Sequence, residues 1–461
     1  MPGTVLRETR GFCPTCMKDL PVQIIEEDDK VYQVKECPDH GEAKGLLSRD
    51  STYYKELSDY YFPILFPPGR EGPERILNYY NYYMTLRCNL NCPICLTDAN
   101  APKREPTLEE IERTIKDFKN FKIGLWGGEA TMRDDLMNII RLIRRTGNIP
   151  ALYTNGIKLK DPHYLDGLLK AGLEVVHMQF DGYDDKGALV LRGAPMADNR
   201  RKAMDVLQEA GVATVLETTH VRDLNLDQVG DIFEEAVKRP NVRAVLFKSY
   251  SYLGKAGVDV DLKVTPEDLM DVLIERFDGR FSRQDVLNFQ RALIAFYDIL
   301  RMHRCLFNHY YLVLRDTNAK DGFRMVGELI DLAAIQPALE VYKDRRVKGS
   351  SLATPFLVLS MLPHLLRPRA WPLLRDAIST TLHRIVYGER FTGATMSTRS
   401  LILAFGSVCD PYTYDAQASK FCIGGEITVD DGTFPTLWAS NFHRERDLRA
   451  DNSTEVGTPQ V

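Results

Sequence analysis

The sequence lacks any long hydrophobic run and any excess of charge of one sign. Its richest apolar stretch, residues 356–366, is too short to span a bilayer and contains Pro363 and His364. The N-terminus, MPGTVLRETRGF, has no apolar core of the kind found in signal peptides. The 59 basic and 64 acidic residues leave a net charge of −5, which gives no electrostatic reason to expect nucleic-acid binding. We therefore expect no transmembrane segment, no nucleic-acid partner and a cytoplasmic location.

The sequence is also poor in cysteine, with nine in 461 residues, and six of these fall in close sets. Clustered cysteines in a chain of this kind indicate metal ligands in a reducing compartment rather than a disulfide framework. The length exceeds that of one typical domain, and 44% of the residues are apolar. We expect a large catalytic domain with a sizeable core and smaller accessory parts.

The N-terminal region, residues 1–45, has the spacing of a metal-binding hairpin. Cys13 and Cys16 form one pair of ligands, and Cys37 and His40 form another. Between them, two short alternating runs are joined at Asp28–Asp29, which predicts a β-hairpin. This arrangement is typical of a zinc ribbon, in which zinc (or iron) substitutes for a core that so small a segment cannot build. We expect a structural role for this site, and a linker over residues 46–79.

A second set of cysteines, Cys88, Cys92 and Cys95, lies in the stretch MTLRCNLNCPICLTDAN. Clustered thiolates suit zinc or iron–sulfur centres, but zinc sites usually close with four protein ligands. Three cysteines without a nearby fourth ligand favour a 4Fe–4S cluster with one iron left open. At this point the chain resembles the radical S-adenosylmethionine (SAM) superfamily. The resemblance implies that these cysteines bind one 4Fe–4S cluster and that SAM occupies the open iron.

Residues 80–257 alternate strand and helix patterns six times. Thr107 and Glu110, for example, form a capping box that starts the first of these helices. The repeat predicts an α/β fold, a parallel partial (β/α)6 barrel with active-site residues at the carboxyl ends of its strands. An open doubly wound sheet is the alternative. Residues 258–400, which begin a helix at Thr265–Pro266, predict a mostly helical C-terminal region.

The resemblance to the superfamily assigns SAM-binding roles to three strand ends. Gly127, Gly128 and Glu129 form the GGE segment that holds the amino group of SAM in the superfamily. Gly residues allow the backbone to approach closely, and Glu can pair with an ammonium group. Asn155, in TNG, and Asp181, in QFDG, are candidates to reach the SAM ribose.

Other polar residues in the predicted barrel are candidates for contacts with SAM or substrate. Arg192 could pair bidentately with the SAM carboxylate, or it could be a solvated arginine at a helix end. Glu217 and His220 interrupt one predicted strand, and Lys248 and Tyr250 interrupt the next. Inward-facing polar groups suggest substrate contacts, with ordinary hydrogen bonding near the loops as the alternative.

Within the superfamily, the motifs quoted above and the CPTC…CPDHG opening resemble the branch that contains archaeal tetraether-lipid synthases. The likeness covers residues 11–255 and returns in the segment 401–442. In that branch this segment carries several cysteines that bind an auxiliary cluster. Here only Cys409 and Cys422 remain, and Leu437–Trp438 stand where a cysteine is expected. Even with the distant Cys305, we expect no auxiliary cluster, and we expect a disordered tail over residues 443–461.

The resemblance implies that SAM is cleaved to methionine and a 5′-deoxyadenosyl radical, which abstracts hydrogen from a small-molecule substrate. Without an auxiliary cluster to accept an electron, we expect a redox-neutral reaction of lyase or oxidoreductase type. Dehydration or deoxygenation of a polyol or aminosugar, in aminoglycoside-type antibiotic biosynthesis, fits this best. The alternatives are C–C coupling or methylation of a lipid or pterin-like substrate and, from another class, a non-catalytic metal-bound scaffold.

The same resemblance implies further participants. We expect an electron donor of flavodoxin or ferredoxin type, and a reductase that acts on the product is a further candidate partner. Cys409 is the candidate hydrogen-atom donor, with Cys422 and Cys305 as competitors for that role.

Overall fold

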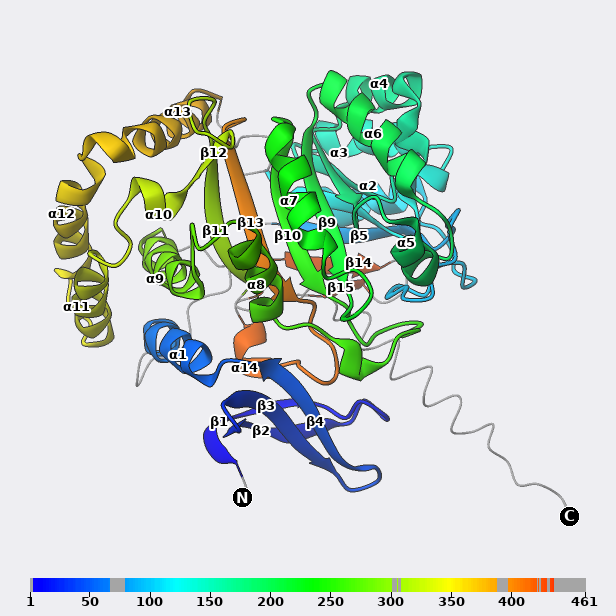
Figure 1. Ribbon diagram of the computed structural model, residues 1–461. Helices are drawn as coiled ribbons and strands as arrows, with labels where there is room; N and C mark the ends of the chain where they lie inside the picture. Colours follow the sequence, from blue (N-terminus) through cyan, green and yellow to red (C-terminus); the bar gives the residue numbers. More distant parts are fainter. Residues whose placement is uncertain are drawn as a thin grey trace, which may run out of the picture.

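The structure is a computed structural model that describes residues 3–66, 79–300, 305, 308–387, 397–420, 422, 424–428 and 432–434. The side chains of residues 380–387 and 432–434 are outside this description, as are the predicted tail over 443–461 and Leu437–Trp438. Figure 1 shows a small sheet at the N-terminus beside a much larger one that is flanked by helices.

The N-terminal region forms a four-stranded antiparallel sheet in the order β1-β2-β3-β4. The strands are β1 (Thr4–Phe12), β2 (Asp19–Glu27), β3 (Lys30–Cys37) and β4 (Gly41–Ser48). The predicted hairpin is the β2–β3 pair, and its turn residues Asp28 and Asp29 have φ of 51° and 58°. The sequence analysis missed the outer strands, and the sheet extends three residues beyond the predicted boundary at residue 45.

The predicted linker contains a helix that belongs to the main core. Helix α1 (Ser51–Leu65) is capped by Asp50, whose side chain accepts a hydrogen bond from Tyr53 N. Its buried face includes Leu57 and Tyr60, which pack in the main hydrophobic core. The first part of the segment expected to be a linker is therefore a helix packed on the main core, and the regular spacing of its aromatic residues reflects the buried helix face.

The large sheet has eleven strands in the order β12-β11-β13-β10-β9-β8-β7-β6-β5-β14-β15. Its six central strands are all parallel, which confirms the predicted α/β fold with a parallel core. They are β5 (Tyr79–Thr85), β6 (Lys122–Gly127), β7 (Ile149–Thr154), β8 (Val175–Gln179), β9 (Ala213–His220) and β10 (Val242–Ser249). The helices between and after them are α2 (Leu108–Ile115), α3 (Leu136–Arg145), α4 (Pro162–Ala171), α5 (Asp185–Arg192), α6 (Ala197–Glu209), α7 (Gln228–Lys238) and α8 (Pro266–Arg276). Short 3-10 turns follow β6 (Ala130–Met132), β7 (Lys158–Lys160) and β10 (Val260–Leu262).

The C-terminal region is mostly helical, as predicted, but it also adds strands to both edges of the sheet. Strand β13 (Ser400–Ser407) pairs in parallel with β10, and β14 (Gly424–Thr428) pairs in parallel with β5. The other strands are β11 (Asn308–Arg315), β12 (Phe323–Met325) and β15 (Gly432–Phe434). The helices are α9 (Arg283–Ile299), α10 (Val326–Leu329), α11 (Gln336–Val347), α12 (Ala353–Leu365), α13 (Trp371–Tyr387) and α14 (Ala416–Ser419), with a 3-10 turn at Pro368–Ala370.

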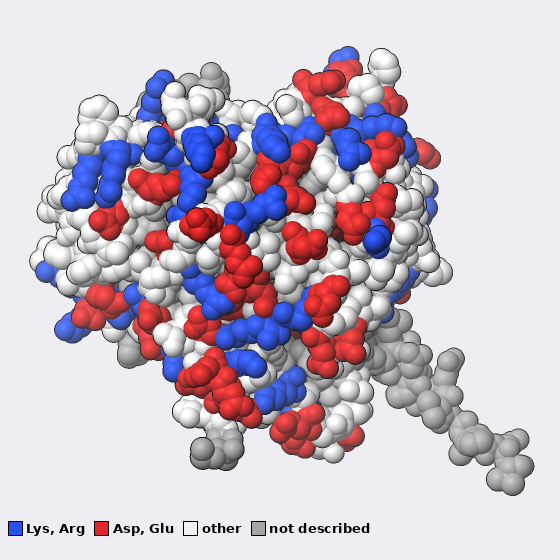
Figure 2. Space-filling model, in the orientation of Figure 1, with Lys and Arg blue, Asp and Glu red and all other residues white. Residues whose placement is uncertain are grey.

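Charge on the surface is mixed. Lys and Arg side chains alternate with Asp and Glu over the face seen in Figure 2, without a continuous field of one sign. Within the described residues, no helix has the length and apolar character needed to cross a membrane.

Candidate active site and metal centres

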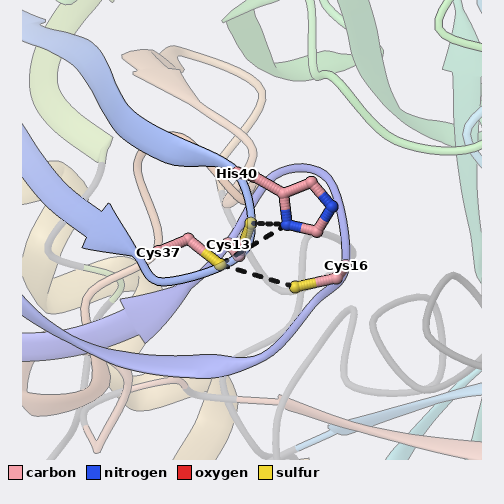
Figure 3. Close-up of side chains that lie close together, drawn as sticks. All are labelled: Cys13, Cys16, Cys37 and His40. Atoms are coloured by element: carbon pink, nitrogen blue, oxygen red, sulfur yellow. Dashed lines mark hydrogen bonds between the residues drawn. The ribbon is translucent and has the colours of Figure 1, made fainter.

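Four side chains of the N-terminal sheet converge on one point (Figure 3). Cys16 Sγ lies 3.8 Å from Cys37 Sγ, and His40 Nδ1 lies 3.4 Å from Cys37 Sγ and 3.8 Å from Cys13 Sγ. Two sulfurs at corners of a tetrahedron with zinc–sulfur bonds of about 2.3 Å would lie about 3.8 Å apart. All four ligand atoms lie within 4.8 Å of one another, so this donor set fits zinc.

The loop that follows β5 brings Cys88, Cys92 and Cys95 to the wall of a cavity of about 210 Å³. Backbone N–H groups already point at two of the sulfurs. Leu90 N lies 3.4 Å from Cys88 Sγ, and Ala99 N lies 3.2 Å from Cys95 Sγ. Three thiols that face one cavity, with N–H donors at the sulfurs, fit the ligation of an iron–sulfur cluster.

Close backbone packing holds this loop from two sides. On one side, Gly128 N donates to Thr85 O at 2.7 Å, and a Cβ on Gly127 would meet the same oxygen at 2.2 Å. On the other side, Lys255 N donates to Cys95 O at 3.0 Å. Gly254, with φ +64°, lies so close that its Cβ would be 2.2 Å from Cys95 O. Glycine is required at these positions because only it leaves room for the loop backbone.

Glu129, directly after Gly127 and Gly128, presents its carboxylate at the cavity wall. The side chain is buried, and burial raises the pKa of Glu129. Its Oε1 accepts from Thr131 Oγ1 at 2.7 Å and from Thr154 Oγ1 at 2.8 Å, and its Oε2 accepts from Asn155 N at 2.8 Å. The structure thus gathers the predicted SAM-binding residues Gly127, Gly128, Glu129 and Asn155 beside the three cysteines.

Asp181 has partners other than the predicted ribose. Its carboxylate accepts from Arg192 Nε at 2.8 Å, from Arg200 Nη2 at 2.8 Å and from Thr219 N at 2.9 Å. Although burial opposes ionisation, Arg192 and Arg200 lower the pKa of Asp181 to about 2. Asp181 therefore anchors Arg192, which lines the cavity, instead of lining the cavity itself.

The predicted substrate residues divide into two groups. Glu217, Lys248 and Tyr250 line the cavity, and Lys248 Nζ lies 2.6 Å from Glu217 Oε2. His220 does not line it, because side chains alternate along β9 and Glu217 and His220 are an odd number of residues apart. The ring of His220 is buried against Thr218 Oγ1 at 2.8 Å and Asn225 O at 3.1 Å, so the predicted substrate contact is not formed.

Cys409 is not among the residues that line this cavity, although Leu96, which packs with it against Met17 and Leu253, is one of them. Burial and the neighbouring thiols of Cys305 and Cys422 raise the pKa of Cys409 well above its usual value. The thiols of Cys305 and Cys422 are thus close enough to act electrostatically on Cys409. The expected absence of an auxiliary cluster, which rests on the small number of cysteines in this segment, stays a prediction.

The sequence analysis missed an aromatic layer in the cavity wall, formed by Trp126, Tyr153 and His177 from β6, β7 and β8. The ring centroids of Tyr153 and His177 are 4.2 Å apart and stacked, and Trp126 meets Tyr153 edge-on at 5.0 Å. His177 Nδ1 lies 2.9 Å from Glu217 Oε1, which joins this layer to the Glu217–Lys248 pair. Each of these three aromatic residues stands one or two positions before a polar strand end. That position in the sequence could have indicated that they line the site.

The sequence matches two known domain families. Residues 82–236 match the Radical SAM superfamily, and residues 5–49 match the HMPTM N-terminal zinc ribbon domain. The chain therefore contains a radical SAM domain preceded by a zinc ribbon. Such a domain implies a 4Fe–4S cluster and SAM as cofactors, and the Cys/His site of the ribbon implies zinc.

Several known proteins resemble parts of the chain. A 7,8-dihydro-6-hydroxymethylpterin dimethyltransferase of Methanocaldococcus jannaschii is 33% identical over 308 residues, covering 60% of each chain. A probable GTP 3′,8-cyclase of Thermoplasma volcanium is 38% identical over 161 residues, covering 33% of this chain and 48% of the relative. Streptococcus suis SuiB bound to S-adenosylmethionine aligns with a TM-score of 0.39 at 17% identity, covering 44% of this chain and 48% of that one. The chain thus spans about half to three fifths of the length of these two curated relatives.

Proposed function

We propose that this chain, which carries a radical SAM domain at residues 82–236, is an enzyme that methylates a pterin-like heterocycle. The pterin dimethyltransferase of M. jannaschii supports this class of reaction, as does the HMPTM type of the zinc ribbon. Methylation of a pterin-like substrate was one of the alternatives expected from the sequence, and the relatives favour it over dehydration. The tetraether-synthase branch stays a prediction.

The observation that carries the proposal is the aromatic layer of Trp126, Tyr153 and His177 in the wall of the cavity that the three cysteines share. Aromatic side chains favour planar ring systems, which stack on their faces or meet them edge-on. The same wall includes the ion pair of Glu217 with Lys248. An alkyl chain would desolvate these charges without offering hydrogen bonds, so the wall suits a polar heterocycle better than a lipid.

With a 4Fe–4S cluster and SAM bound, the cofactors supply the radical that attacks an unactivated C–H bond. The chain supplies binding and position. Cys88, Cys92 and Cys95 would ligate the cluster, and Glu129 would accept hydrogen bonds from the SAM ammonium group. Arg192 uses Nε and Nη2 for Asp181 and Thr219, so in place of the expected bidentate pair it would face the SAM carboxylate through Nη1. The aromatic layer would hold the substrate and keep water from it.

The second candidate is the redox-neutral dehydration or deoxygenation of a polyol or aminosugar. The Glu217–Lys248 pair favours it, since a carboxylate and an ammonium group can both hydrogen-bond to hydroxyls. A scaffold without catalysis is disfavoured, because it would have no use for a buried carboxylate facing three thiols. The electron donor of flavodoxin or ferredoxin type and the product reductase stay predictions.

Incubation of the reduced, cluster-loaded protein with 7,8-dihydro-6-hydroxymethylpterin and excess SAM tests the proposal, since one SAM molecule has to supply the radical and a second one the methyl group. We expect a product heavier by one methylene group, detected by mass spectrometry, and none with Cys88→Ala. Unchanged pterin, together with loss of water from an aminosugar under the same conditions, would replace the first candidate with the second.

A further inference from the structure

Strand β8 presents two polar side chains to the cavity, His177 and Gln179. They are two residues apart, so they lie on the same face of the strand with about 7 Å between their Cα atoms. Each is hydrogen-bonded to a carboxylate: His177 to the partly exposed Glu217, and Gln179 to the buried Asp181. A carboxylate that is ionised can only accept hydrogen bonds, and this fixes the orientation of both side chains.

The tautomer of His177 follows from its neighbours. Lys248 Nζ lies 2.6 Å from Glu217 Oε2 and, although burial opposes ionisation, the attraction of Lys248 and the bond from His177 lower the pKa of Glu217 to about 2. Burial lowers the pKa of His177 to about 4, so the ring is neutral and carries one N–H. Because Glu217 cannot donate, that hydrogen is on Nδ1, and Nε2 carries a lone pair. Among the described residues, no group donates to this Nε2.

The amide orientation of Gln179 follows in the same way. Its Nε2 donates to Asp181 Oδ2, and Asp181 is kept ionised by two arginines. The amide oxygen, Oε1, must therefore point away from Asp181. This oxygen is buried and has no hydrogen-bond partner among the residues that the structure describes. A buried acceptor without a partner is costly, which indicates that a ligand donor satisfies it when the site is filled.

We propose that His177 Nε2 and Gln179 Oε1 are a pair of hydrogen-bond acceptors that determine substrate specificity, selecting a heterocycle that presents N–H and amino donors. Lys248, across the sheet on β10, is the neighbouring donor for a ring carbonyl. An amino-oxo pyrimidine ring offers this combination, whereas a ring with oxo in place of amino would set acceptor against acceptor. This inference rests on the proposed function. It adds which edge of the substrate ring the site binds, namely the edge that carries the N–H and amino groups.

The test measures binding of two probes to the holoenzyme loaded with cluster, zinc and SAM. One probe is 7,8-dihydro-6-hydroxymethylpterin, and the other is its counterpart with oxo in place of the amino group. We expect the amino probe to bind about ten- to a hundredfold more tightly. His177→Phe keeps the ring in the aromatic layer and removes the acceptor, so it should lose most of this preference. Gln179→Leu should reduce it similarly.

Glu217→Gln separates a specific role from a structural one. A glutamine can donate to Nδ1 as well as accept from it, so the imidazole can adopt the other tautomer and present N–H to the ligand. The preference should then narrow or reverse while SAM affinity, the measure of an intact site, stays unchanged. Equal binding of both probes to the unmodified protein, or an undiminished preference in both His177→Phe and Gln179→Leu, would overturn this inference alone. Binding of neither probe, with SAM bound normally, would overturn the proposed function as well.

Discussion

Replacement of Glu129 by glutamine should weaken SAM binding and leave the iron–sulfur site loaded. Glutamine keeps the size and shape of the side chain, and its amide oxygen can still accept from Thr131 and Thr154, which lie 2.7 and 2.8 Å from Oε1. What is lost is the negative charge that we propose faces the SAM ammonium group. A hydrogen bond to a charged group contributes about 1.5–3 kcal/mol, so the dissociation constant should rise about ten- to a hundredfold.

The same substitution has a calculable effect on folding. Asn155 N donates to Oε2 at 2.8 Å, and in the variant the amide NH2 group would face this N–H, donor against donor. An unsatisfied buried donor costs about 1–3 kcal/mol, which we expect as the loss in the free energy of unfolding. Glu129→Ala would leave more donors unpaired, so the loss of stability could not be separated from the loss of SAM affinity. Glutamine is therefore the better substitution.

Anaerobic titration calorimetry with SAM, at matched iron content, measures the dissociation constant of SAM. Glu267→Gln is the matched control, because Glu267 is also 1% exposed but lies in a different cavity. The control should bind SAM with unchanged affinity. If Glu129→Gln also bound SAM as tightly as the unmodified protein, the assignment of Glu129 to the ammonium group would be refuted.

Three further predictions follow from particular residues. Cys37→Ser should lose zinc and unfold the small sheet first, measured by metal analysis and hydrogen exchange; full zinc retention would contradict the four-ligand site. Gly254→Ala should lose iron because its Cβ would meet Cys95 O at 2.2 Å, whereas Gly211→Ala, also at positive φ but with open space around it, should keep iron. At constant zinc content, stability should fall as pH drops from about 6.5 towards 4, by up to about 1.4 kcal/mol per pH unit for each of three histidines, two buried and one partly buried, that take up a proton only on unfolding. Burial lowers the pKa of each to about 4, and they are His177, His220 and His309. A melting temperature unchanged between about pH 7 and 5 would contradict the last prediction.

Local signals in the sequence predicted the central part of the fold. The six parallel strands follow from alternation of strand and helix patterns, and the capping box of Thr107 and Glu110 is formed as expected. Helix α8 likewise begins after Thr265. The strands β13 and β14 could not be found in this way, because each pairs with a strand more than a hundred residues away and non-local pairing leaves no local pattern.

The sequence predicted the site residues that stand in loops or at strand ends. It predicted less well the site residues that lie inside the strands. The cysteines and the GGE segment have a characteristic spacing, and they lie together at one cavity. Tyr153 and His177 look like ordinary core residues in a hydrophobic strand, and only the direction in which they point gives them a role. The partners of Asp181 come from three separate segments, so its anchoring role was not readable from the sequence.

Formation of 5′-deoxyadenosine from SAM is the most direct test of the account. The protein, reconstituted with iron and sulfide and reduced anaerobically, should release 5′-deoxyadenosine and methionine. Cys88→Ala, which removes one of the three thiols at the cavity, should release neither. Failure of the unmodified, iron-loaded and reduced protein to cleave SAM would contradict the assignment of radical chemistry and favour the scaffold alternative.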